Sequence, residues 1–220
     1  MSTAPKLYTI PAGFPFLDAL AAGLAERSGA EALANARVLL PTRRACRALA
    51  DAFLRQGGGA PLLLPAMTPL GDVDEDDLAF TELGADLDIP PAISGTRRQM
   101  LLTRLVLALK SGHTTPDQAA RLAAELARLL DRVATERLSF DRLADLVPDE
   151  LADHWRITLK FMNILTESWP AVLADEGCIE PAERRNRLFE AQARAWRLAP
   201  PPGPVVVAGS TGTVPATADL

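Results

Sequence analysis

Residues 38–53 read VLLPTRRACRALADAF, and this stretch decides the fold. The apolar residues within 37–40 predict a buried strand, which Pro41 stops. Thr42 can cap a helix, because its hydroxyl accepts a hydrogen bond from an unpaired N–H group in the first helical turn. Apolar residues then recur at helical spacing, and the glycines at 57–59 end that helix. The stretch therefore predicts a strand that leads directly into a helix.

The segments on either side continue the same alternation. Residues 7–10 form a short apolar run closed by a Pro-Ala-Gly turn at 11–13, which predicts a strand. Leucines at helical spacing follow from Phe16, and Gly29 lies beyond the end of that helix. The apolar residues 62–64 predict a third strand. Strands that alternate with helices in this way predict a parallel sheet with right-handed crossovers.

The pattern changes over residues 94–198, where apolar residues recur only at helical spacing. Such stripes pack against one another, so we expect an all-helical subdomain. The four stripes comprise Met100, Leu101, Leu105 and Leu109; Leu122, Leu126, Leu129, Leu130 and Val133; Leu151, Trp155, Leu159, Met162, Leu165 and Trp169; and Leu188, Ala191, Ala195 and Leu198.

A proline-rich linker at 200–203 then leads into three valines at 205–207, which predict a strand that rejoins the early sheet. The predicted fold class is therefore α/β, a parallel sheet interrupted by a large all-helical insertion. The predicted domains are residues 1–93, the first part of the α/β domain; 94–199, the helical insertion; and 200–220, the return strand of the α/β domain.

The charge of the chain is uneven. Its formal net charge is -5, and a compact nucleic-acid-binding domain is usually basic, which argues against that class of function. Residues 35–55, however, hold five Arg against one Asp, whereas residues 71–88 hold eight acidic residues and no basic one. Because salt screens charges beyond roughly 10 Å, a ligand responds to the local patch. The local positive charge of residues 35–55 is therefore compatible with binding of a phosphate group.

Composition predicts a soluble, cytoplasmic protein. Apolar residues make up 48% of the chain and charged residues 23%, so we expect a packed core. No run approaches the roughly 20 apolar residues of a membrane span, and the N-terminus lacks the apolar stretch of a signal peptide. We therefore expect a cytoplasmic location and no membrane contact.

Thr42, Arg43 and Arg44 are the candidate binding residues. The first N–H groups of a helix are unpaired and carry partial positive charge. A hydroxyl and two guanidinium groups beside them suit a phosphate group. The alternative is a solvated helix start without a ligand.

The turn around Gly13 stands where a phosphate-cradling loop would follow a first strand. Such a loop reads GxxxxGK[ST], in which the Lys supplies charge and the hydroxyl holds magnesium. Phe14, Pro15 and Phe16 follow Gly13 instead, so we expect no nucleotide hydrolysis at this position. An ordinary tight turn that meets no nucleotide is the alternative.

The sequence predicts neither a metal site nor a catalytic group. Cys46 and Cys178 form no CxxC motif, and His113 and His154 have no second ligand or nucleophile at a suitable spacing. The acidic run at 72–77 lacks the spacing of a calcium loop.

Five segments, in order, give the chain a family resemblance. It is similar along its whole length to the N-terminal part of AddB, the double-strand break repair subunit of the alphaproteobacterial type. The segments are YTIPAGFPFLDAL at 8–20, VLLPTRRACRAL at 38–49, PLGDVDEDDL at 69–78, RLADLVPDELADHW at 142–155 and AGSTGTVPATADL at 208–220.

The resemblance implies a fold and partners. AddB pairs with AddA, a superfamily 1 helicase and nuclease, to process broken DNA ends before recombination. The family has P-loop NTPase-like helicase domains in its N-terminal region and a nuclease domain with an iron–sulphur cluster at its C-terminal end. The cluster and magnesium would lie beyond residue 220, so no cofactor is expected here. A helix is expected to begin near Pro215, but only five residues follow, which agrees with a fragment of such a protein.

The resemblance also implies a role for the candidate residues. Residues 38–53 would occupy helicase motif Ia, so that Thr42, Arg43 and Arg44 face DNA, most simply a single strand. The loop at Gly13 lacks its Lys and hydroxyl, and Gly-Ser-Thr follows 205–207 where an active helicase has Asp-Glu. We therefore expect a non-motor, non-catalytic DNA-contacting scaffold. The alternative, which the net charge favours, is a protein-interaction scaffold without DNA contact.

Overall fold

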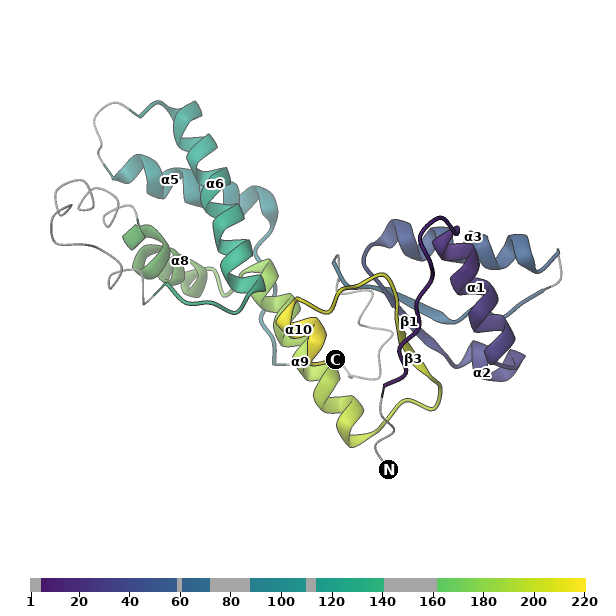
Figure 1. The fold of residues 1–220 in the computed structure, drawn as a ribbon. Coiled ribbons are helices and arrows are strands. Elements are labelled where there is room, and N and C mark those ends of the chain that lie inside the picture. Colours follow the sequence, from purple (N-terminus) through teal and green to yellow (C-terminus); the bar gives the residue numbers. More distant parts are fainter. Residues whose placement is uncertain (1–4, 59–60, 72–87, 110–113, 141–161) are drawn as a thin grey trace, which may run out of the picture. The chain divides into compact units, whose positions relative to one another are not determined.

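The computed structural model divides the chain into two compact units (Figure 1). The sheet unit comprises residues 1–85 and 195–211, and the helical unit comprises residues 86–194 and 212–220. Within them the structure describes residues 5–58, 61–71, 88–109, 114–140 and 162–220.

Three parallel strands form the sheet of the sheet unit. They are β1 (Arg37–Leu40), β2 (Ala66–Pro69) and β3 (Val205–Val207), in the spatial order β2-β1-β3. Residues 205–207 therefore do return to the early sheet: Val38 of β1 lies opposite both Met67 and Val206. The protein combines helices with a small parallel sheet, as the alternating pattern predicts.

Two predicted strands differ from the structure. Residues 7–10 belong to no strand and have no strand partner among the described residues, and the side chain of Leu7 is 95% exposed. The third strand begins at Ala66, after the predicted run at 62–64, because the register with β1 pairs Arg37 with Ala66. Pairing with a buried central strand outweighs the local apolar pattern here.

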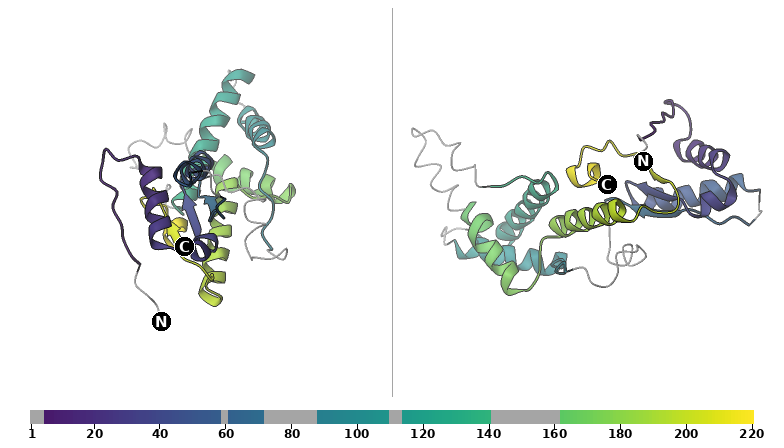
Figure 2. Two further views of the ribbon diagram at one scale, coloured as in Figure 1. Left: turned by 90° about the vertical axis from the view of Figure 1, so that its right-hand side faces the viewer. Right: turned by 90° about the horizontal axis from the view of Figure 1, so that it is seen from below.

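Three helices accompany the sheet: α1 (Phe16–Arg27), α2 (Ala30–Ala34) and α3 (Arg43–Gln56). Their apolar residues share one core with the sheet, in which Leu24 of α1 and Leu49 and Phe53 of α3 pack with Val38 and Leu40 of β1. Figure 2 shows these helices from two further directions. Because α1 and α3 bury residues against the same two side chains of β1, both helices cover the same face of the sheet.

The helical unit contains α5 (Gly95–Ala108), α6 (Pro116–Thr135), the π-helical turn η3 (Ile164–Ser168), α8 (Trp169–Asp175) and α10 (Pro215–Ala218). Helix α9 (Pro181–Leu198) begins in this unit, and its residues from Ala195 belong to the sheet unit. No described helix is long and apolar enough to cross a membrane.

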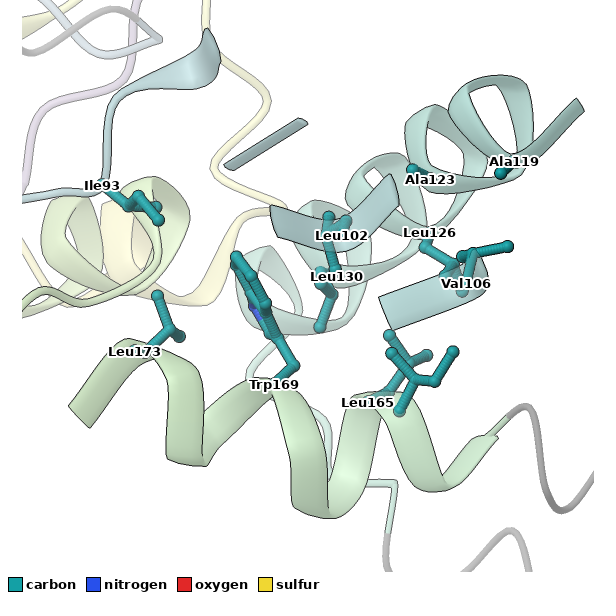
Figure 3. Packing of buried hydrophobic residues seen from close by; sticks show 11 residues of the cluster. Ile93, Leu102, Val106, Ala119, Ala123, Leu126, Leu130, Leu165, Trp169 and Leu173 are labelled. Carbon is teal, nitrogen blue, oxygen red and sulfur yellow. The ribbon is translucent and has the colours of Figure 1, made fainter. Parts of the chain in front are cut away.

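Trp169 lies at the centre of the core of the helical unit (Figure 3). Its side chain is only 1% exposed and packs in one cluster with Leu102 of α5, Leu130 of α6 and Leu173 of α8. These side chains come from helices far apart in sequence. Their burial is the main stabilising contribution in this unit.

The buried face of α5 differs from the predicted stripe. Met100 is 63% exposed, whereas Arg98, Leu102 and Val106 are buried. These three residues are four apart in sequence, so they lie on one face of the helix. Because one of them is an arginine, a search for apolar residues alone does not find this face. The part of the third stripe from Leu151 to Leu159 lies outside the described residues.

Candidate functional site

The carboxyl ends of the three strands form one end of the sheet, which we call the carboxyl end. The chain leaves β1 through Pro41, β2 through Leu70 and Gly71, and β3 through Ala208. Main-chain hydrogen bonds join these exits: the Leu70 N–H donates to the Leu40 carbonyl at 2.7 Å, and the Gly71 N–H donates to the Pro41 carbonyl at 3.1 Å. In open parallel sheets, ligands bind outside the carboxyl ends of the strands.

Thr42 caps α3 at this end. Its backbone is extended, with φ -142° and ψ 157°, and its Oγ1 accepts a hydrogen bond of 3.1 Å from the Ala45 N–H. The sequence prediction of a cap at Thr42 is therefore confirmed. Because the oxygen accepts from the helix, the Thr42 hydroxyl hydrogen remains a donor for a further group.

Arg43 and Arg44 lie in the first turn of α3, as predicted. Arg44 is exposed and Arg43 is half-buried. No acidic residue lies in this first turn, so the turn itself supplies no opposite charge. A cationic group near a helix N-terminus is unfavourable to the helix dipole, and a bound anion would relieve that repulsion.

Gly13 forms a turn with the left-handed backbone that a glycine allows. Its φ is +96°, and the Phe14 N–H donates to the Pro11 carbonyl at 3.3 Å. The turn leads into α1, where Pro15 at the N-cap gives no side-chain hydrogen bond and Asp18 lies in the first turn. The Asp18 carboxylate is paired with Arg55 of α3, whose Nη2 lies 2.5 Å from Asp18 Oδ1.

The start of α1 and the turn after β3 meet at the carboxyl end. Gly209 has φ +69°, and a Cβ at this position would lie 3.4 Å from Phe16 Cε1 and 3.6 Å from Pro41 Cδ. The exits of β1 and β3 and the first residue of α1 are therefore within contact distance of one another. Phe14, two residues before α1, is 65% exposed.

A second polar cluster lies inside the helical unit, and the sequence did not indicate it. The side chains of Arg98 and Glu180 are each 8% exposed, and Arg98 Nη2 lies 2.6 Å from Glu180 Oε2. Arg98 also lies 3.0 Å from Asp131 Oδ1 and donates to the Ala127 carbonyl at 3.0 Å. The indole N–H of Trp169 donates to Glu180 Oε1.

Burial raises the pKa of the Glu180 carboxyl above its ordinary value, and the nearby Arg98 charge only partly opposes this. Oε2 accepts no well-aligned hydrogen bond from the described residues, although Arg98 is close to it. The cluster ties α5 and α6 to Trp169 and the start of α9. Glu180 and Trp169 also line a groove of the helical unit.

A groove of about 770 Å³ opens beside this cluster in the helical unit. Leu130, Trp169 and Leu173 contribute apolar surface to it. At its rim the charges are paired: Arg137 lies 2.8 Å from Glu190 Oε1, and Arg187 lies 2.5 Å from Glu183 Oε1. The described residues hold no group of three His, Cys, Asp or Glu side chains that could bind a metal ion.

The remaining candidates of the sequence are two cysteines, two histidines and an acidic run. Cys46 and Cys178 form no disulfide, and each unit holds one of them. His113, His154 and the acidic run at 72–77 lie outside the described residues.

No protein-family model matches the chain, and no curated protein and no solved structure shows a significant similarity to it. The resemblance to AddB thus rests on the five sequence segments alone.

Proposed function

We propose that the chain is the N-terminal region of an AddB-type subunit, which works with an AddA-type helicase–nuclease in resecting broken DNA ends for recombination. In this proposal Thr42, Arg43 and Arg44 contact the phosphate backbone of single-stranded DNA. One observation carries it: Thr42 caps α3 at the carboxyl end of a parallel sheet, with both arginines in the first turn. That end is where such sheets bind ligands.

The proposed region is a scaffold and not a motor. The turn at Gly13 offers no lysine or hydroxyl. The turn after β3 carries Gly209 and Ser210, with no carboxylate that could hold a magnesium ion there. We therefore place ATP hydrolysis, nuclease activity and the iron–sulphur cluster elsewhere in the complex. The helicase-like topology, with the helical unit as its insertion, and the cytoplasmic location are parts of the same proposal.

The test is the salt dependence of DNA binding. Fluorescence anisotropy with a labelled oligo(dT) single strand, from low to moderate salt, gives the slope of log K against log salt concentration. If Arg43→Ala or Arg44→Ala removes one phosphate contact, this slope should fall by about 0.7. A double variant at Arg121 and Arg128 of α6 removes the same charge from exposed positions and serves as control. An unchanged slope in the double variant of Arg43 and Arg44 would show that these arginines do not contact DNA.

The net charge of -5 favours a second candidate, a protein-interaction scaffold without DNA contact. The same titration separates the two functions. If the unsubstituted chain fails to bind the strand at low salt and yet binds an AddA-type partner, the scaffold function is the correct one.

A further inference from the structure

The groove of the helical unit has the size of a small-molecule site. Its volume of about 770 Å³ lies within the range of about 300–1,000 Å³ that is typical of such sites. Trp169 and Phe140 contribute aromatic rings to its lining, and Leu130, Leu165 and Leu173 contribute aliphatic side chains (Figure 3). A stable protein interface extends over about 800 Å² of each partner, far beyond a groove of this size. The dimensions therefore favour a small molecule.

The charged side chains that line the groove are paired. At the rim, Arg137 and Arg187 form ion pairs with two glutamates of α9. Deeper in the lining, the Glu180 carboxylate lies 2.6 Å from Arg98 Nη2. Because each of these charges already has a partner of opposite sign, the groove gives an ion little electrostatic attraction. The electrostatics therefore favour a neutral ligand.

Asn186 of α9 lines the groove and carries an acceptor without a donor. This residue is only 6% exposed. Its Nδ2 donates to the Ala134 carbonyl at 2.7 Å, which fixes the orientation of the amide, because the reversed amide would place two oxygen atoms against each other. Asn186 Oδ1 accepts no hydrogen bond from the described residues. A buried acceptor without a donor is unfavourable, so a ligand N–H or O–H group that pairs with it would gain affinity.

A ligand reaches this oxygen by displacing side chains at the rim. Asn186 Oδ1 is covered by neighbouring atoms. Glu183 and Glu190 lie about one helical turn before and after Asn186, on the same face of α9, and their side chains are half-exposed. Exposed side chains change rotamer within nanoseconds. Rotation of these two glutamates would therefore open the way to the amide.

We propose that the groove of the helical unit binds a small, neutral, aromatic molecule that donates one hydrogen bond to Asn186 Oδ1. The aromatic class follows from the rings of Trp169 and Phe140, since aromatic rings pack favourably edge to face or in an offset stack. The donor follows from the fixed amide of Asn186. This proposal is independent of the proposed DNA contact, because the groove is formed by the helical unit alone.

Two matched probes test the hydrogen bond. Carbazole is a neutral aromatic molecule with one N–H group, and N-methylcarbazole has the same rings without that donor. We expect the full chain to bind carbazole, measured by the fluorescence of the probe, and to bind N-methylcarbazole about fivefold more weakly, the effect of one neutral hydrogen bond. In the variant Asn186→Leu the two probes should bind with equal affinity, because the acceptor is gone.

A substitution inside the groove tests its location. Ala174 of α8 is exposed and lines the groove, whereas Ala171 is exposed in the same helix outside it. Ala174→Trp places a large side chain in the groove and should weaken carbazole binding at least about tenfold. Ala171→Trp is the matched control and should leave the affinity unchanged.

Cys178 provides a measurement that needs no variant. It is half-buried and lines the groove, whereas Cys46 belongs to the sheet unit. Modification of both thiols by N-ethylmaleimide is followed by mass spectrometry of the full chain. Saturating carbazole should slow the modification of Cys178 several-fold and leave that of Cys46 unchanged.

Four outcomes would overturn the proposal. They are the absence of saturable carbazole binding, equal affinity of the unsubstituted chain for both probes, full affinity in Ala174→Trp, and modification of Cys178 that is no faster in the free chain than with carbazole. The last outcome would show that the chain itself fills the groove. Circular dichroism identifies a variant that fails to fold, and the modification of Cys178 in the unsubstituted chain then decides.

Discussion

Gly203 lies against Asn35 so closely that a Cβ at position 203 would stand 2.1 Å from the Asn35 carbonyl oxygen. Asn35 precedes β1, and Gly203 precedes β3. The close approach therefore brings the linker to the start of β1, where the Arg37 N–H binds the Pro204 carbonyl. Only a residue without a side chain allows this entry into the sheet.

Gly203→Ala should destabilise the sheet unit by roughly 1–3 kcal/mol, because the added methyl group displaces main-chain atoms that cannot move independently. Gly23→Ala is the control. Gly23 lies inside α1, and nothing stands within 4 Å of the position of its Cβ. This change should stabilise the protein by about 0.5–1 kcal/mol through helix propensity. Urea unfolding of both variants measures the difference, and equal effects would contradict the close approach.

Thr42→Ala should cost about 1 kcal/mol of unfolding free energy, because the Ala45 N–H then loses its cap. Thr42→Ser keeps the hydroxyl and should cost much less. Chemical denaturation of the two variants decides between a structural cap and a side chain without a local role. If Ala and Ser behave alike, the hydroxyl does not cap α3 in solution.

Arg98→Ala should destabilise the helical unit by about 3–5 kcal/mol, because it leaves the buried Glu180 carboxyl without its cation. The adjacent Arg97 provides a matched control. Its side chain is 60% exposed and pairs with Glu176 at the surface, so Arg97→Ala should change the stability little. Thermal unfolding followed by circular dichroism compares the two variants. Similar losses at both positions would mean that Arg98 is not buried.

Stability should depend on pH through Glu180. Burial raises the pKa of this carboxyl in the folded state, so the folded state holds the proton more tightly than the unfolded chain does. The resulting stabilisation is complete below the unfolded pKa, about 4.3, and is lost as the pH rises through the raised folded pKa. Relative to Glu180→Gln, the unsubstituted protein should therefore lose stability from pH 4 upward. Urea unfolding across pH 4–8 measures this, and a constant difference between the two proteins would refute it.

The local signals around Thr42 predicted the structure well. A strand that stops at a proline, followed by a hydroxyl and a helical stripe, specifies β1, the cap and α3 through interactions between neighbours in sequence. The three valines at 205–207 likewise indicated β3. Its return to the early sheet was predicted as well, and the structure places it beside β1.

Non-local choices were not predictable in the same way. Residues 7–10 have a local apolar pattern, but a strand also needs a partner, and they have none among the described residues. Arg98 was overlooked because its partner Glu180 is 82 residues away. Its position four residues before Leu102, on the buried face of α5, was the one available signal.

The order β2-β1-β3 has a consequence for biosynthesis. The central strand acquires one neighbour soon after it is made, but its second neighbour is translated only after α5, α6, α8 and α9. At the usual speed of a ribosome this delay is on the order of ten seconds. During that time one edge of the nascent β1 has no partner strand. A chaperone that binds extended apolar segments would bind at this edge.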